Sequence, residues 1–175
     1  MKSILLLRHA KSDWDADYVG DHQRPLAERG KKGSVKVGRF LARTEQVPEL
    51  VLCSTALRTR ETLERAMDAG EWTDVDVKYD NAIYHAGLDQ MLSCLRTIPD
   101  HVNIAMIVGH EPTTSLLAGQ LVGGASISFP TASIGRIDLN IEHWKSCRSG
   151  VGTLMWHVLP KHLKKAIKVK TSAKT

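Results

Sequence analysis

Three short motifs in the chain carry side chains that can bind and transfer a phosphoryl group. Arg8-His9 follows one apolar run, Arg58 follows a second and His110 follows a third. An arginine binds phosphoryl oxygens through a planar fork of donors and stays protonated near neutral pH. A neutral imidazole is a nucleophile that can take up the group and so divide one difficult step into two easier ones. Arg8, Arg58 and His110 are suited to clamping the transferring group electrostatically.

The three motifs lie far apart in the sequence, so the fold must bring them together. Each directly follows a segment that is typical of a buried strand, and the carboxyl ends of parallel strands share one edge of a sheet, where ligands bind. Two arginines and two histidines at one edge repel each other unless an anion offsets their charge. Helix N-termini near Ala56 and Pro112 would add backbone N–H groups that favour such an anion.

The order of the remaining segments predicts the fold class. Short apolar runs alternate with longer periodic segments, which favours a three-layer α/β/α sandwich with a mostly parallel central sheet. The last two strands are expected to be antiparallel. Strands are expected at residues 4–7, 49–53, 75–79, 103–108, 132–140 and 152–159, and helices at 26–42, 56–69, 88–98 and 112–122. The segment 9–24 has little pattern and is long for a passive connection, so it is a candidate functional loop.

The length and charge of the chain indicate one domain with a basic tail. The 175 residues are enough for a single core. The last fifteen residues hold six lysines and no acid; removing those six from the 24 basic residues leaves 18 basic against 19 acidic residues. We therefore expect one domain over residues 1–160 and a lysine-rich tail over 161–175. A solvated terminus is the favoured interpretation of the tail, and a weak anchor for an anionic partner is the alternative.

Several classes of protein are excluded by what the sequence lacks. No apolar run approaches the ~20 residues of a membrane span, and the run after Met1 is too short for a secretory signal. Three cysteines without CxxC spacing predict reduced thiols, which is typical of a cytoplasmic protein. Position 114 is Thr, so His110-Glu111 begins no zinc HExxH motif, and no metal or cofactor is expected. The four tryptophans are dispersed, so no stacking platform for nucleic acid is predicted.

At these motifs the sequence resembles the histidine phosphatase superfamily, which includes the phosphoglycerate mutases. Residues 7–12 are similar to the family's RHG motif, with Ala10 in place of Gly, and Gly109-His110 resembles its second histidine. Ser54, Arg58 and Thr62, four residues apart, resemble its second arginine motif. The run RHAKSDW, then Arg-Pro-Leu at 24–26, Arg-Gly at 29–30 and finally GHEP, is most similar to the short phosphohistidine phosphatases of the SixA type. The resemblance covers roughly residues 4–124 and implies a phosphoglycerate mutase-like fold.

The resemblance implies roles for individual residues. His9 would be the phosphorylated nucleophile, with Arg8, Arg58 and His110 around the phosphate. Ser12 and Asp15 correspond to further contacts near the phosphate, although a carboxylate at position 15 would repel an anion.

The resemblance also exposes one departure from the family. Many members carry a glutamate acid in a segment that matches residues 81–88, where this chain has no carboxylate. Glu111 and His85 are the substitute acids to consider, and either could orient water. A phosphohistidine leaving group needs no separate acid, whereas a sugar alkoxide does.

The sequence therefore predicts a metal-independent phosphatase that forms a phosphohistidine intermediate and acts on phosphohistidine in a protein. The expected partners are that phosphorylated protein and an oxyanion in the pocket, with no nucleic acid and no membrane. Two alternatives remain open: a small-molecule phosphomonoesterase or mutase of the same superfamily, and a non-catalytic module that binds phosphoproteins. A third, nucleic-acid binding, would depend on the lysine tail.

Overall fold

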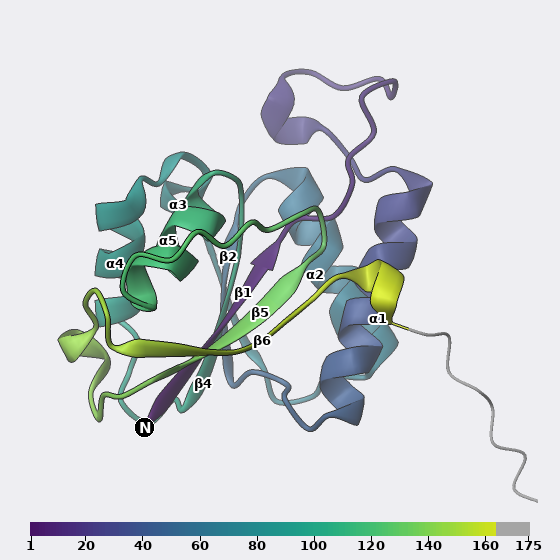
Figure 1. Cartoon of the computed structure of the whole chain (residues 1–175). Helices are drawn as coiled ribbons and strands as arrows, with labels where there is room; N and C mark the ends of the chain where they lie inside the picture. Colours follow the sequence, from purple (N-terminus) through teal and green to yellow (C-terminus); the bar gives the residue numbers. More distant parts are fainter. Residues whose placement is uncertain (164–175) are drawn as a thin grey trace, which may run out of the picture.

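A six-stranded mixed sheet forms the centre of the molecule, and helices cover both of its faces (Figure 1). The computed structural model describes residues 1–163. The strands are β1 (Lys2–Arg8), β2 (Leu50–Ser54), β3 (Asp76–Asp80), β4 (Ile104–Gly109), β5 (Ile134–Leu139) and β6 (Gly152–Val158). The helices are α1 (Glu28–Arg43), α2 (Leu57–Gly70), α3 (Ala82–His85), α4 (Leu88–Arg96) and α5 (Thr113–Leu121), with 3₁₀ turns η1 (Asp21–Gln23), η2 (Trp144–Ser146) and η3 (Pro160–His162).

The strand order is β3-β2-β4-β1-β5-β6. The pairs β2–β3, β2–β4 and β1–β4 are parallel. The pairs β1–β5 and β5–β6 are antiparallel, as expected for the last two strands. Because β4 lies between β2 and β1, the ends of all three motif-bearing strands are neighbours at one edge of the sheet.

The first strand shows why the sheet is covered on both faces. Its side chains alternate between two cores: Ile4 and Leu6 pack in one, Leu5 and Leu7 pack in the other, and all four are fully buried. Helices α4 and α5 contribute to the first core, and α1 and α2 contribute to the second. A strand that is buried on both faces has a continuous apolar sequence, which explains the run at residues 4–7.

The predicted order of elements is confirmed, with small shifts at their ends. The first helix begins at Glu28 rather than Leu26, because Leu26 pairs with Ser12 in an isolated antiparallel bridge. The helix predicted to reach Ile98 ends at Arg96. None of the described helices has the length and apolar character needed to cross a membrane.

Four short elements, the helix α3 and the 3₁₀ turns η1, η2 and η3, were absent from the predicted order. The four-residue helix α3 and the 3₁₀ turn η1 are too short to produce a hydrophobic period. Turn η3 includes Lys161, so the predicted boundary of the lysine tail falls inside a described element. The rest of the predicted tail, from residue 164 onward, lies outside the described residues.

Helices α1 and α2 approach closely where a glycine faces a backbone carbonyl. A Cβ atom on Gly38 would lie 1.9 Å from the carbonyl oxygen of Ala66, which is a forbidden distance. Trp72 donates its indole N–H to the carbonyl oxygen of Gly38 at 3.2 Å and so covers the same contact. Gly33, earlier in α1, is different, because a Cβ there would lie an ordinary 3.4 Å from the Cβ of Ala132.

We expect Gly38→Ala to destabilise the protein by about 2–3 kcal/mol, because the added methyl group forces α1 and α2 apart. Gly33→Ala is the matched control in the same helix, and it should be neutral or stabilising by up to about 1 kcal/mol, because alanine favours helix. Urea unfolding of the two variants measures both effects. Equal losses of stability in the two variants would contradict the close approach of α1 and α2.

Candidate active site

The three predicted motifs meet at the carboxyl edge of the sheet. Arg8 pairs with Gly109 in the register of β1 and β4. His9 and His110, which directly follow these two residues, therefore lie side by side at the ends of the strands. Their imidazole ring centroids are 5.2 Å apart. Arg58 comes from the first turn of α2, directly after β2. The convergence predicted from the sequence is thus present.

The backbone around His9 is fixed on both sides. Its N–H donates to the carbonyl oxygen of Gly109 at 3.0 Å, and its carbonyl oxygen accepts the N–H of Ala132 at 3.1 Å. The next N–H, that of Ala10, donates to Oγ1 of Thr62 at 2.9 Å. These bonds come from β4, from the segment before β5 and from α2. The position of the imidazole therefore depends on three separate parts of the chain.

The hydrogen bonding of the His9 ring selects its tautomer. Nδ1 lies 2.8 Å from the carbonyl oxygen of Ala10, and a carbonyl can only accept, so Nδ1 carries the proton. In the neutral ring, Nε2 then keeps its lone pair. This is the arrangement that a nucleophilic histidine needs.

The environment keeps both histidines neutral. Burial, reinforced by the charges of Arg58 and Arg8, lowers the pKa of His9 from 6.5 to about 4, despite the opposing bond to Ala10. Burial and the nearby His9 and Arg58 lower the pKa of His110 to about 3. At neutral pH the His9 ring is therefore an uncharged base with a free lone pair.

The two arginines retain buried donors that no described residue accepts. Arg8 donates from Nη1 to the carbonyl oxygen of Phe129 at 2.8 Å, and Arg58 donates from Nη1 to the carbonyl oxygen of Asp21 at 2.7 Å. Among residues 1–163, the buried Nε atoms of both arginines have no hydrogen-bond partner. Burial also lowers the pKa of Arg8. Buried cationic donors of this kind are satisfied best by an oxyanion.

The spacing of Ser54, Arg58 and Thr62 has a simple structural reason. Residues four apart share one face of a helix, so Arg58 and Thr62 both face the site from α2, and Ser54 ends the preceding strand. The hydroxyl of Ser54 lies 2.8 Å from Nε2 of His110, while Oγ1 of Thr62 accepts the backbone N–H of Ala10, next to His9. Each member of the motif thus contacts a different part of the site.

The sequence reasoning did not single out Asp21, which lies among the arginines. Its carboxylate accepts from Arg58 Nη2 at 2.9 Å, from Arg24 Nη2 at 2.7 Å and from the hydroxyl of Tyr84 at 2.9 Å. Burial opposes ionisation of this carboxyl, but hydrogen bonds from Arg24 and Tyr84 and the charge of Arg58 prevail and hold its pKa at about 2. Arg24 belongs to the Arg-Pro-Leu run, which was the only sequence signal for this cluster.

The four weaker candidates are placed differently from one another. Ser12 is buried and accepts a hydrogen bond from Nη1 of Arg24, so it lies beside the arginine cluster. The exposed Asp15 donates its backbone N–H to the carboxylate of Asp13 and forms no hydrogen bond or ion pair with the four central residues in the described structure. His85 is exposed and packs edge-on against Tyr84, with ring centroids 4.4 Å apart.

Glu111 is connected to the site through a chain of hydrogen bonds. Its Oε2 accepts a hydrogen bond from the hydroxyl of Ser115 at 2.7 Å, and the same hydroxyl oxygen accepts the N–H of Phe129. The carbonyl oxygen of Phe129 in turn accepts a hydrogen bond from Nη1 of Arg8. Its Oε1 is buried and has no partner among residues 1–163. Across the same residues, no group of three or more His, Cys, Asp or Glu side chains could hold a metal ion.

Comparison with known proteins agrees with this arrangement. Residues 4–84 match the family model of the histidine phosphatase superfamily, branch 1. The uncharacterized protein Rv1276c of Mycobacterium tuberculosis is 34% identical over 168 residues, which cover 89% of this chain and 100% of that protein. The chain belongs to branch 1 of the histidine phosphatase superfamily.

Within that superfamily, the chain is similar in structure to SixA proteins. The crystal structure of the putative phosphohistidine phosphatase SixA from Agrobacterium tumefaciens has a TM-score of 0.77 at 26% identity, covering 91% of this chain and 98% of the other. The structure of the protein histidine phosphatase SixA complexed with tungstate has a TM-score of 0.79 at 24% identity, covering 93% and 99%. This likeness confirms the predicted phosphoglycerate mutase-like fold.

In phosphate-free buffer, we expect the free energy of unfolding to fall as the pH drops from about 6.5 to about 4. In this window the unfolded chain binds protons at His9 and His110, whereas the folded chain binds them only near its lowered pKa values. Urea unfolding across the window measures the slope. The decline should be shallower in His9→Asn and unchanged in His101→Asn, a substitution at an exposed histidine. A wild-type profile that stays flat would contradict neutral, buried imidazoles.

Proposed function

We propose that the protein is a metal-independent phosphatase that forms a phosphohistidine on His9 and acts on phosphohistidine in a protein substrate. The observation that carries the proposal is the state of His9. Its Nδ1–H donates to the carbonyl oxygen of Ala10, and its pKa is lowered to about 4. The guanidinium groups of Arg8 and Arg58 lie around it, and each has an Nε donor without a partner among the described residues. The site is thus a neutral nucleophile within a cationic clamp.

The proposed reaction has two steps. Nε2 of His9 attacks phosphorus, the bond from phosphorus to the substrate nitrogen breaks, and the departing imidazole takes up a proton. Water then attacks phospho-His9, which releases inorganic phosphate and restores the neutral imidazole. Arg8 and Arg58 stabilise the charge on the phosphoryl oxygens in both steps, because their charge is already in place before the reaction.

The choice of substrate depends on the leaving group. An alkoxide requires a proton donor, whereas the imidazole of phosphohistidine can be protonated on its own ring. Asp21, the carboxyl that contacts Arg58, has a pKa of about 2 and is bonded to two arginines, so it is a poor acid near neutral pH. The segment 81–88 contributes Tyr84 and His85 but no carboxyl group. These features favour a phosphoramidate over a phosphoester.

We expect His9→Asn to lower turnover of phosphohistidine by roughly a thousandfold or more, because asparagine can replace the Nδ1 hydrogen bond but has no nucleophilic nitrogen. His101→Asn is the matched control and should keep wild-type activity. With ³²P-labelled substrate, an alkaline detergent quench should trap label on wild-type His9 and none on the variant.

Excess chelator should leave the activity of the wild type intact, because a cationic clamp repels metal ions. Full loss of activity with chelator, or label at another residue, would overturn the mechanism.

The second candidate is a small-molecule phosphomonoesterase or mutase, and Glu111 is the observation that favours it. This carboxyl has one buried oxygen without a partner and is connected to Arg8 through Ser115 and Phe129. A buried carboxyl beside the clamp could donate a proton to an alkoxide.

Glu111→Gln separates the two candidates. If phosphohistidine is the substrate, the variant should keep its rate on free phosphohistidine within about threefold, because no acid is required. If a phosphoester is the substrate, the rate on a sugar phosphate should be the larger rate in the wild type and should fall by roughly a hundredfold in the variant. Steady-state kinetics on both compounds, with the exposed Glu142→Gln as control, distinguishes these outcomes. A wild-type enzyme faster on the sugar phosphate would overturn the phosphohistidine assignment.

A further inference from the structure

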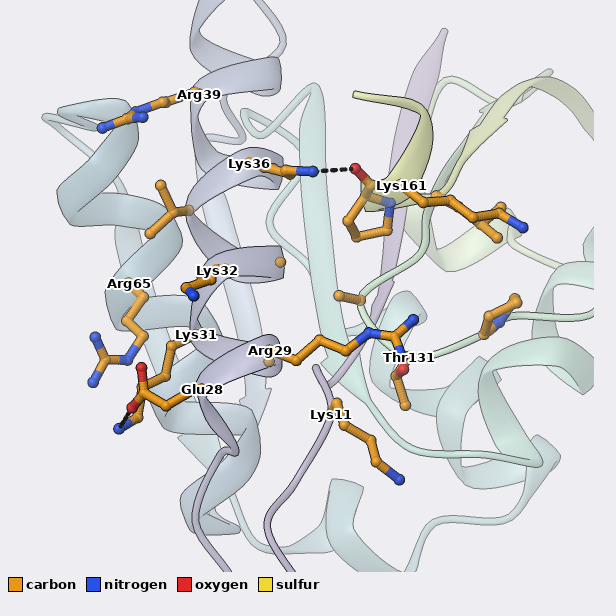
Figure 2. Close-up of a pocket in the computed structure, with 17 residues that line it drawn as sticks. Lys11, Glu28, Arg29, Lys31, Lys32, Lys36, Arg39, Arg65, Thr131 and Lys161 are labelled. Atoms are coloured by element: carbon orange, nitrogen blue, oxygen red, sulfur yellow. Dashed lines mark hydrogen bonds and ion pairs between the residues drawn. The ribbon is translucent and has the colours of Figure 1, made fainter. Parts of the chain in front are cut away.

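A large groove runs along α1, beside the candidate active site (Figure 2). Its volume is about 910 Å³, and its lining comes mainly from α1, with Lys11, Arg65 of α2, the segment 130–132 before β5 and residues 159–161 at η3. Eight of its seventeen lining residues are lysine or arginine, and Glu28 is the one acid. Glu28 forms an ion pair with Lys31 at 2.5 Å, so the lining has an excess of seven basic side chains over acidic ones.

This concentration of charge is local. Residues 1–163, which include every residue of the groove, hold 19 basic and 19 acidic residues, so the described part of the chain is neutral by this count. Arg29 and Lys161 face the groove from α1 and η3, both are exposed, and neither forms an ion pair within the described structure. A surface with this excess of positive charge attracts an anionic partner and speeds its association.

One end of the groove adjoins the nucleophile. Lys11, two residues after His9, lines the groove and accepts the N–H of Ala27 on its carbonyl oxygen at 3.0 Å. The opposite wall includes Ala132, whose N–H donates to the carbonyl oxygen of His9. Figure 2 shows Lys11, Arg29 and Thr131 together at this end. A partner bound along α1 would therefore reach the catalytic edge of the sheet.

The floor of the groove is apolar, which favours a partner with apolar as well as acidic groups. A Cβ atom on Gly33 would be in contact with Ala132 and Pro160, and Leu159, next to Pro160, adds a further apolar side chain. No aromatic residue lines the groove, so it offers no stacking surface for bases. An amphipathic helix with carboxylate side chains on one face and aliphatic side chains on the other fits both the basic rim and the apolar floor. The chain's own lysine-rich end has the wrong sign of charge to occupy it.

We propose that this groove is the docking site for an acidic, amphipathic segment of the protein that carries the phosphohistidine. The proposal rests on the proposed function, since it assigns the partner of the same active site. The segment would lie along α1 and so hold the phosphorylated side chain at the mouth of the catalytic edge. The groove would then give the enzyme a preference for phosphoproteins over free phosphohistidine.

The first experiment measures docking without catalysis. The probes are a fluorescent 20-residue peptide with glutamate and leucine at helical spacing, the same peptide with glutamine for glutamate, and a single-stranded oligonucleotide of equal charge. At low salt the wild type should bind the acidic peptide at least about tenfold more tightly than either other probe. Arg29→Glu/Lys161→Glu should weaken binding of this peptide at least about tenfold.

The matched control is Lys145→Glu/Arg148→Glu, which makes the same change in charge at exposed residues outside the groove. It should change binding of the acidic peptide less than about threefold. Circular dichroism of both double variants checks that each is folded. Equal binding to the groove variant and the wild type would overturn the proposal. So would tighter binding of the oligonucleotide, which would assign the groove to nucleic acid instead.

The second experiment joins docking to turnover. The acidic peptide extended by a phosphohistidine should have a KM at least about tenfold below that of free phosphohistidine. The groove variant should raise the KM of the peptide at least about fivefold more than that of the free compound, with similar kcat. A wild type that hydrolyses neither compound would overturn the proposed function, while the binding assay would still report on the groove. Equal KM changes for both compounds would overturn docking alone.

Discussion

The proposed chemistry of this protein depends on cationic charge being concentrated around one buried imidazole. Burial and the charges of Arg58 and Arg8 keep His9 neutral, and the bond to Ala10 directs its proton to Nδ1. A histidine at the surface would be partly protonated near neutral pH, and its ring could present either nitrogen. In the proposed mechanism, the arginines that would bind the oxyanion also keep the imidazole of His9 neutral, so substrate binding and activation of the nucleophile share one physical cause.

Such a cluster of like charges is unfavourable by itself, and the fold compensates for it. Asp21 bridges Arg24 and Arg58, and Phe129 supplies a carbonyl oxygen to Arg8. The loop that carries Asp21 projects beyond the sheet, above the carboxyl end of β1 (Figure 1). The long, patternless segment after the first strand therefore has a structural role that its composition does not show. It neutralises part of the site while leaving the Nε donors of Arg8 and Arg58 without protein partners.

The site and the groove share the same supports. Ala132 holds the backbone of His9 and also lines the groove, and Gly30 in α1 approaches so closely that a Cβ there would lie 2.1 Å from the carbonyl oxygen of Lys11. The segment that follows His9 is thus packed directly against the helix that forms the groove. A phosphohistidine on a protein surface must be recognised together with its surroundings, and this packing places a basic groove with an apolar floor beside His9. Family membership fixes the superfamily and the fold, whereas the proposed substrate rests on these local features.

The sequence by itself determined the order of strands and helices, the parallel core of the sheet and the meeting of Arg8, His9, Arg58 and His110. These follow from short-range patterns: the apolar run of a strand buried on both faces, the four-residue period of α2, and the rule that parallel strands end at one edge. Only the tertiary structure decided the tautomer of His9, the place of Asp21 among the arginines, the exposure of Asp15 and the path of the basic groove. Each of these depends on contacts between segments distant in the chain, where one hydrogen bond or one close approach decides the outcome and no local period records it.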